Sequence, residues 1–163
     1  GAIQCTPKVP VCLYCPLREN CVALASGQVE KLPVKAGKAV VKPRYFNYLH
    51  IHCRGVNLLA RREAKDIWQN YEYPLIETGQ ETELEVLQQT PAYLELMQEA
   101  GEIQILRSFI MPKHVLSHRI IYARFYEIEV ERFSPVMQRF LQVPEEELEQ
   151  YAVSRLIALY REK

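Results

Sequence analysis

Residues 5–21 read CTPKVPVCLYCPLRENC and place four cysteines within seventeen positions, separated by six, two and five residues. Thiolates this close in sequence can converge on one metal centre at little cost in chain entropy, because the loops between them are short. Prolines in the same stretch restrict the unfolded chain further. The stretch therefore predicts a metal-binding loop. The four expected ligands are Cys5, Cys12, Cys15 and Cys21.

The spacing also bears on which metal these cysteines hold. Structural zinc sites usually join two close pairs of ligands across a longer spacer. Here a single close pair, Cys12 and Cys15, has one cysteine on each side, and Pro16 follows the pair directly. This compact pattern favours a 4Fe–4S cluster held by four thiolates. Zinc, disulfides and unliganded thiols are the alternatives that the residues leave open.

Composition and charge exclude several classes of protein. The 163 residues contain no apolar run long enough to span a membrane, and the first residues lack the pattern of a signal peptide. The net charge is zero, yet residues 1–54 hold eight Lys and Arg against two Glu, while residues 55–163 hold twelve against eighteen. Such asymmetry is typical of a protein with one face towards a polyanion. The start, four residues before the first cysteine, suggests a fragment.

A basic linker is predicted between the cysteine loop and the rest of the chain. Four glycines and prolines between residues 26 and 43 interrupt any periodic pattern, and four lysines accompany a single glutamate. A basic segment of this kind could lie along the phosphate backbone of DNA, and it could equally be a solubilising tether. Candidate phosphate contacts are Lys8 in the cysteine loop and Lys35 and Lys38 in the linker. The predicted division is a cluster loop at 1–25, a linker at 26–42 and one domain at 43–163.

The domain at 43–163 mixes strand and helix patterns, which predicts an α+β fold. Residues 111–119, MPKHVLSHR, lie between two strand patterns and form the tip of a predicted long hairpin; no carboxylate occurs between Glu102 and Glu127, so this region is basic. Strands are expected at 45–53, 58–60, 102–111 and 118–130, with a turn at 55–57, and helices at 22–25, 83–88, 91–100 and 153–163.

Two histidines of the first predicted strand invite a metal interpretation, and a cysteine follows them. His50 and His52 alternate on one face of the strand without a carboxylate nearby in sequence. Histidines in that setting are more typical of a strand surface than of a metal site. Cys53 follows in an apolar context and is expected to be a small core residue. None of the three is therefore assigned a functional role.

These motifs together resemble a known family of DNA repair enzymes. The cysteine spacing, with Gly1-Ala2 and Cys15-Pro16-Leu17, is similar to the cluster loop of helix-hairpin-helix DNA glycosylases. Three later stretches narrow the resemblance to the MutY-type adenine DNA glycosylases, which excise adenine mispaired with 8-oxoguanine. They are Leu58-Leu59-Ala60-Arg61-Arg62, the Trp68 loop before Tyr73-Pro74, and His114-Val115-Leu116-Ser117-His118.

The resemblance implies a fold, a cofactor and partners. The domain at 43–163 would be a Nudix (MutT)-like mixed sheet with flanking helices, preceded by a short cysteine-rich 4Fe–4S cluster loop that ends the helical glycosylase domain. The catalytic carboxylates of the family lie upstream, so this fragment would hold no catalytic residue and would be inactive alone. The implied partners are double-stranded DNA with A:8-oxoguanine or A:G mispairs and the N-terminal catalytic domain of the same chain. The implied location is the cytoplasm, at the nucleoid.

The resemblance also implies which residues recognise the damaged base. 8-Oxoguanine differs from guanine because its N7 is a hydrogen-bond donor and its C8 carries a carbonyl. A protein can detect this change from the major groove, where the N7 of guanine is an acceptor. A hydroxyl can accept from the first group or donate to the second. In the family a serine at the hairpin tip makes such contacts, which implies that role for Ser117. His114, Leu116 and His118 flank it as further recognition residues, with Leu116 where the family often has an aromatic residue.

Two other functions compete with damage recognition. Nudix hydrolases cleave nucleoside diphosphates with a helix that carries a Gly, then Arg-Glu-x-x-Glu-Glu, for metal binding. Residues 79–101 begin and end with glycine and contain several Glu, but they have no Arg and no adjacent pair of Glu. This disfavours the hydrolase. The third candidate is a zinc-bound interaction module without a nucleic-acid role.

Overall fold

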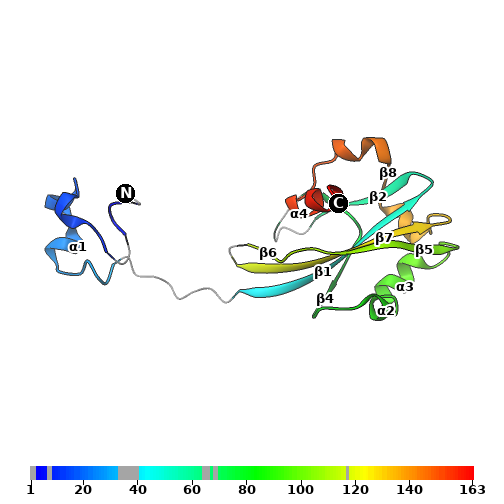
Figure 1. Ribbon diagram of the computed structural model, residues 1–163, viewed down its shortest axis with the longest axis horizontal. Coiled ribbons are helices and arrows are strands. Elements are labelled where there is room, and N and C mark those ends of the chain that lie inside the picture. The colour runs from blue at the N-terminus through cyan, green and yellow to red at the C-terminus, as the bar shows by residue number, and fades with distance from the viewer. Residues whose placement is uncertain (1–2, 7–8, 33–40, 64–66, 68–69, 117) are drawn as a thin grey trace. The chain divides into compact units, whose positions relative to one another are not determined.

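The computed structural model describes residues 3–6, 9–32, 41–63, 67, 70–116 and 118–163 (Figure 1). The backbone divides into two compact units, residues 1–40 and residues 41–163. Each unit is described by itself. In the described part of the chain, no helix is both long and apolar enough to cross a membrane.

The first unit consists of three short helical turns. They are η1 (Cys12–Tyr14), η2 (Arg18–Asn20) and α1 (Val22–Ala25). The helical turn predicted at 22–25 is therefore confirmed. No described residue of this unit is fully buried, so the unit has no hydrophobic core of its own within the described residues.

The second unit is built on an eight-stranded mixed sheet. Its main path runs β3-β2-β1-β7-β5, while β4 pairs with β1, β6 with β7 and β8 with β2. The long central strands β1 and β7 are parallel, and the other pairings between strands are antiparallel. The strands are β1 (Lys42–Cys53), β2 (Val56–Arg61), β3 (Tyr71–Glu72), β4 (Leu75–Thr78), β5 (Ile103–Ile110), β6 (His114–Val115), β7 (Arg119–Val130) and β8 (Leu141–Pro144).

The two faces of the sheet each bury a separate core. Successive side chains of a strand point to opposite faces, so Phe46 and Tyr48 of β1 enter one core, while Leu49 and Ile51 enter the other. The helix α4 (Arg155–Arg161) covers the first core, and α2 (Leu84–Leu87) and α3 (Pro91–Met97) cover the second. In Figure 1, α2 and α3 lie on one side of the sheet and α4 on the other. The predicted α+β fold is confirmed.

Local sequence signals predict where the helices begin more accurately than where they end. Thr90 caps α3 by accepting from the backbone N–H of Tyr93, and Pro91 occupies the first helical position, as predicted. The predicted end at residue 100 is wrong, because Gln98 leaves the helical region and Glu99 takes a φ of 65°. This early exit lets Ala100 turn back into the second core. The last helix is likewise shorter than the predicted 153–163.

The first hairpin turn also differs from its prediction. The turn residues are Arg54 and Gly55, with φ of 49° and 77°, and not residues 55–57. A two-residue hairpin turn needs positive φ at both central positions, which glycine supplies at one of them. Val56 and Asn57 already belong to β2, where they pair with Cys53 and His52. The remaining elements are two 3₁₀ helices, η3 (Val136–Arg139) and η4 (Glu145–Gln150).

Candidate functional site

Short helical turns position the four cysteines of the first unit. Cys12 begins η1 and Cys15 caps it, and the backbone N–H of Cys15 donates to the carbonyl of Cys12 over 3.2 Å. Cys21 ends η2 and precedes α1, where its carbonyl accepts from the N–H of Ala25 over 2.9 Å. The two-residue gap between the close pair thus falls on a single helical turn. This is the geometric reason why such a pair can serve one centre.

All four cysteines line one cavity of about 320 Å³. They are free thiols, and Arg18 lies on the same wall. No three Cys, His, Asp or Glu side chains within the described ranges come close enough to share one metal ion. The structure thus brings the four predicted ligands to the lining of one cavity, and four thiolates are a donor set that both a 4Fe–4S cluster and a zinc ion accept. The remaining walls are mostly apolar, from Pro10, Ala23, Leu24, Val29 and Leu32.

The predicted hairpin tip is formed by β6, β7 and the turn between them. His114 pairs with Ile121 across the two strands. The backbone N–H of Leu116 donates to the carbonyl of Arg119 over 2.8 Å, and the N–H of Arg119 donates to the carbonyl of Leu116 over 3.4 Å. This reciprocal pair closes a tight turn. Ser117 follows Leu116 in the sequence and lies outside the described residues.

Side chains around this turn divide into an anchor and an exposed surface. Leu116 is half-buried and packs against the first core. His114 is half-buried as well, whereas His118 is exposed and the Val115 side chain is 62% exposed. The anchor holds the turn on the sheet while its outer side faces solvent. The recognition roles of His114, Leu116 and His118 stay predictions.

The positive charges near the tip are fewer than the sequence suggested. Arg107 binds Glu127, with 2.7 Å between Nε and Oε2, and Arg124 binds two glutamates. Within the part of the chain that the structure describes, Lys113 and Arg119 make no ion pair with a carboxylate. These two cations therefore remain available beside the turn.

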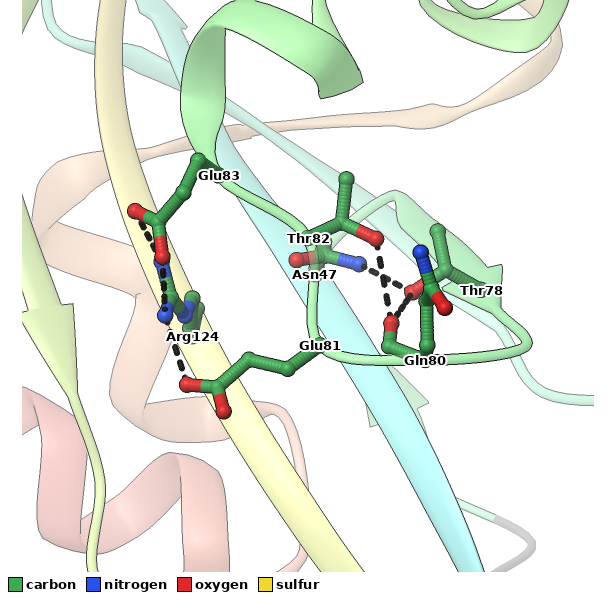
Figure 2. Close-up of polar contacts among 7 residues, drawn as sticks. All are labelled: Asn47, Thr78, Gln80, Glu81, Thr82, Glu83 and Arg124. Atoms are coloured by element: carbon green, nitrogen blue, oxygen red, sulfur yellow. Dashed lines mark hydrogen bonds and ion pairs between the residues drawn. The ribbon is translucent and has the colours of Figure 1, made fainter.

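Figure 2 shows how Arg124 is held between Glu81 and Glu83 of the loop that follows β4. The Arg124 Nη2 lies 2.6 Å from Glu81 Oε1, and the Nη1 lies 2.8 Å from Glu83 Oε2. The hydrogen bond to Glu83 is the main cause that raises the pKa of Arg124, and the same bond lowers the pKa of Glu83. Asn47 fixes the loop from the other side by donating to Thr78 Oγ1 over 3.2 Å.

This arrangement weakens the Nudix hydrolase alternative. Residues 79–101 form a loop and two short helices, α2 and α3, instead of one long helix carrying glutamates. Glu81 and Glu83 compensate the charge of Arg124, so they face a cation of the protein itself. Two of the five glutamates of this segment are therefore engaged in ion pairs with Arg124.

A carboxylate from another strand lies beside His50 and His52, although none is near them in the sequence. It is Glu127 of β7, opposite His50 in the parallel register, with its Oε1 3.6 Å from His52 Nε2. His50 is half-buried: its Nε2 lies 2.7 Å from Asn57 Oδ1 and its Nδ1 2.9 Å from the Tyr160 hydroxyl. Burial lowers the pKa of His50. Because an amide oxygen only accepts, this geometry assigns the imidazole proton to Nε2.

The two histidines line a cavity of about 750 Å³ between the sheet and α4. Its remaining walls carry Tyr73, Tyr160 and several glutamates. The sequence offers no local signal for this cavity, because Glu127 is brought to the histidines by a parallel pairing across more than seventy residues. The other residues singled out from the sequence, Lys8, Lys35, Lys38 and Trp68, lie outside the described residues.

Comparison with known proteins agrees with the mixed sheet and its helices. The family model described as "NUDIX domain" matches residues 47–163, and the chain belongs to the NUDIX domain family. The adenine DNA glycosylase of Buchnera aphidicola subsp. Schizaphis graminum (strain Sg) is 31% identical over 70 residues, which are 43% of this chain and 20% of that protein. The matched region thus spans about a fifth of the length of that relative.

Two solved structures are similar to the chain at low sequence identity. The solution structure of the Escherichia coli ORF135 protein has a TM-score of 0.45 and 18% identity, over 75% of this chain and 88% of that one. The C-terminal domain of mouse MUTYH, crystallised with human PCNA, has a TM-score of 0.47 and 17% identity, over 72% and 85%.

Proposed function

We propose that this chain is the C-terminal damage-recognition part of an adenine DNA glycosylase that removes adenine mispaired with 8-oxoguanine. The observation that carries the proposal is the hairpin turn after β6, which is anchored by Leu116 and exposed at His118. Membership of the NUDIX family, the similarity to a bacterial adenine DNA glycosylase and the cysteine spacing support the same conclusion.

The turn has the chemistry that recognition of 8-oxoguanine needs. A hydroxyl at Ser117 would accept from N7–H or donate to O8, and guanine offers neither group. Lys113 and Arg119 would meet phosphates on either side of the base, which positions the turn without reading sequence. His118 would add a polar contact from the exposed side. The pairing of β6 with β7 joins the turn to a central strand of the sheet, which supports this role.

The four cysteines are proposed to hold a 4Fe–4S cluster. Their free thiols line one cavity with largely apolar walls, and Arg18 would balance part of the negative charge of the thiolates. The cluster would supply cross-links that hold the short turns of the first unit together. Purification without oxygen should give iron and acid-labile sulfide in equal amounts, and a preparation that instead contains zinc would contradict the cluster.

Catalysis is proposed to require the N-terminal domain of the same protein. Cleavage of a glycosidic bond needs a proton donor and a carboxylate beside the sugar, and the family carries them upstream of the cysteine loop. The isolated chain should therefore bind A:8-oxoguanine and A:G duplexes without releasing adenine. Such a protein would act on DNA in the cytoplasm. Adenine release by the pure chain would contradict this division of roles.

Duplex binding tests the proposal directly. The chain should prefer a duplex with A:8-oxoguanine over the same duplex with A:G, and Ser117→Ala should reduce that preference by about 1–3 kcal/mol, the scale of one discriminating contact. Ser108→Ala, which alters an exposed serine on β5, serves as the matched control and should retain the preference. An equal loss on both duplexes, or no loss, would contradict the role of Ser117.

A further inference from the structure

A third cavity, of about 670 Å³, lies at the end of β2 and carries unpaired positive charge. Arg61 ends β2, and Arg139 ends η3 just before β8. Because Leu59 of β2 pairs with Leu141 of β8, each arginine lies two residues beyond the same pair of the antiparallel ladder. The backbone thus brings both guanidinium groups to one cavity.

These two arginines differ from Arg62, which lines the same cavity. Arg62 forms a buried ion pair with Glu72, with 3.1 Å between Nη1 and Oε1. Arg61 and Arg139 are exposed, and neither guanidinium group forms a hydrogen bond or an ion pair with any residue that the structure describes. Like charges gathered in this way repel each other. An anion placed between them would remove the repulsion and gain two charge-assisted hydrogen bonds.

Two residues of the cavity wall are held by contacts within the domain. The guanidinium carbon of Arg139 lies 5.0 Å from the centre of the Phe140 ring, a cation–π contact that restricts the side chain before any ligand arrives. Tyr71 is fixed by its backbone N–H, which donates to the carbonyl of Ala152 over 2.9 Å, and by edge-on packing against Tyr151 at 5.0 Å. A preformed site loses less entropy when it binds a ligand.

We propose that Arg61 and Arg139 bind a phosphate group of the DNA backbone. This inference rests on the proposed function and adds a second contact to it. The strand β2 runs antiparallel to β1, while β7 runs parallel to β1 and begins at Arg119 beside the hairpin turn. The end of β2 therefore points towards the same end of the sheet as the turn, so that one duplex can reach both.

The chemistry favours a phosphodiester over other anions. The planar guanidinium fork matches the oxygens of a phosphate in pairs. Glu63 on the rim is exposed and reduces the positive charge of the cavity, which suits a singly charged diester. The site contacts the backbone alone, so it contributes equally to damaged and undamaged DNA.

The test compares duplex binding by charge-matched variants of the full chain. Arg61→Gln with Arg139→Gln should weaken binding to A:8-oxoguanine and undamaged duplexes by the same factor, roughly tenfold at low salt. The slope of log K against log salt should fall by about one unit. Arg54→Gln with Arg155→Gln removes the same net charge elsewhere on the surface and should change the affinity less than twofold. Glu63→Gln should tighten binding.

The outcomes distinguish failure of this phosphate site alone from failure of the proposed function. If the wild-type chain prefers 8-oxoguanine but the Arg61 and Arg139 variant keeps the wild-type affinity and salt slope, the phosphate site is wrong and the proposed function stands. If the variant and the charge-matched control weaken binding alike, the effect is general charge and the site is again wrong. If the wild-type chain binds no duplex, the proposed function fails and this site fails with it.

Discussion

The two units of the chain are stabilised in different ways. The unit at 41–163 buries two hydrophobic cores on opposite faces of its sheet, with Phe125 and Leu58 fully inaccessible to solvent. The unit at 1–40 has no fully buried residue among those described, and its turns are three or four residues long. Helical turns that short are not stable by themselves. The second unit is thus held by its cores, whereas the described residues of the first unit form none, which is why we propose a cluster at its cysteines.

The largest expected effect is loss of order in the first unit when the cluster cannot form. Cys12→Ser with Cys15→Ser should abolish amide protection across residues 9–32, because the cavity then lacks two of its four thiols. Protection in residues 41–163 should stay unchanged. Hydrogen exchange with mass spectrometry measures both units in one experiment. Cys53→Ser, which alters a cysteine of the second unit, is the control and should keep the protection of residues 9–32. If the double variant shows the same protection there as the wild-type chain, the structural role of the cluster is contradicted.

The next largest effect concerns the core of the second unit. Phe125 is fully buried, with its ring 4.8 Å from that of Tyr48 and 4.2 Å from that of Tyr160. Phe125→Ala should lower the free energy of unfolding of this unit by about 3–5 kcal/mol through lost burial and a new cavity. Urea unfolding followed by circular dichroism measures the loss. Leu94→Ala, at a side chain that is 57% exposed on α3, should cost about 0.5 kcal/mol or less.

A smaller effect should appear as a dependence of stability on pH. Burial lowers the pKa of His50 below its ordinary value of 6.5. Just below pH 6.5 the imidazole is therefore protonated more often in the unfolded chain than in the folded chain. The free energy of unfolding should therefore fall as pH drops through 6.5 towards 5.5. Groups facing His50 include His52, Asn57, Tyr73, Tyr160, Glu127 and Glu145.

The control for this effect is His118, an exposed histidine of the same unit. His118→Gln should keep the wild-type fall, and His50→Gln should lose most of it, as measured by urea unfolding at several pH values. Glu127 has a lowered pKa, so its own contribution is lost only as pH falls below its ordinary value of 4.5, outside this window. A fall of equal size in His50→Gln would contradict the assignment.

The smallest effect is expected at Lys8 in the cysteine unit. If this lysine contacts a phosphate, Lys8→Ala should weaken binding to all duplexes alike and lower the salt slope by about one unit. Measurements of affinity at several salt concentrations supply the slope. Lys163→Ala, in the other unit, is the control. An unchanged slope would restrict DNA contact to the second unit.

Features that depend on neighbouring residues were predictable, and features that depend on distant pairing were not. The cap at Thr90 and the central strands β1 and β7 follow from local patterns. The short strands β3, β4, β6 and β8 have too few residues to show an alternation and form because longer strands offer them an edge. The placement of Glu127 beside His52 depends on a parallel register, which no local pattern encodes.

The candidate site shows the same division. The cysteine spacing indicated a shared centre, and all four thiols line one cavity. The position of the hairpin turn was predicted, but the packing of Leu116 into the core was not, because burial depends on the whole sheet. The sequence also did not predict that Arg61 and Arg139 line one cavity, because this depends on the pairing of β2 with β8. Nor did it predict that Arg62, and not Arg61, forms the ion pair with Glu72.

The central claim is that the turn between β6 and β7 reads the oxidised base. Amide chemical shifts of the chain bound to an A:8-oxoguanine duplex, compared with the same duplex carrying A:G, test it most directly. We expect the differences in chemical shift to concentrate at residues 113–119. The amide shifts at the end of β2 near Arg61 should be the same in both complexes. Differences centred elsewhere, with residues 113–119 unchanged, would contradict it.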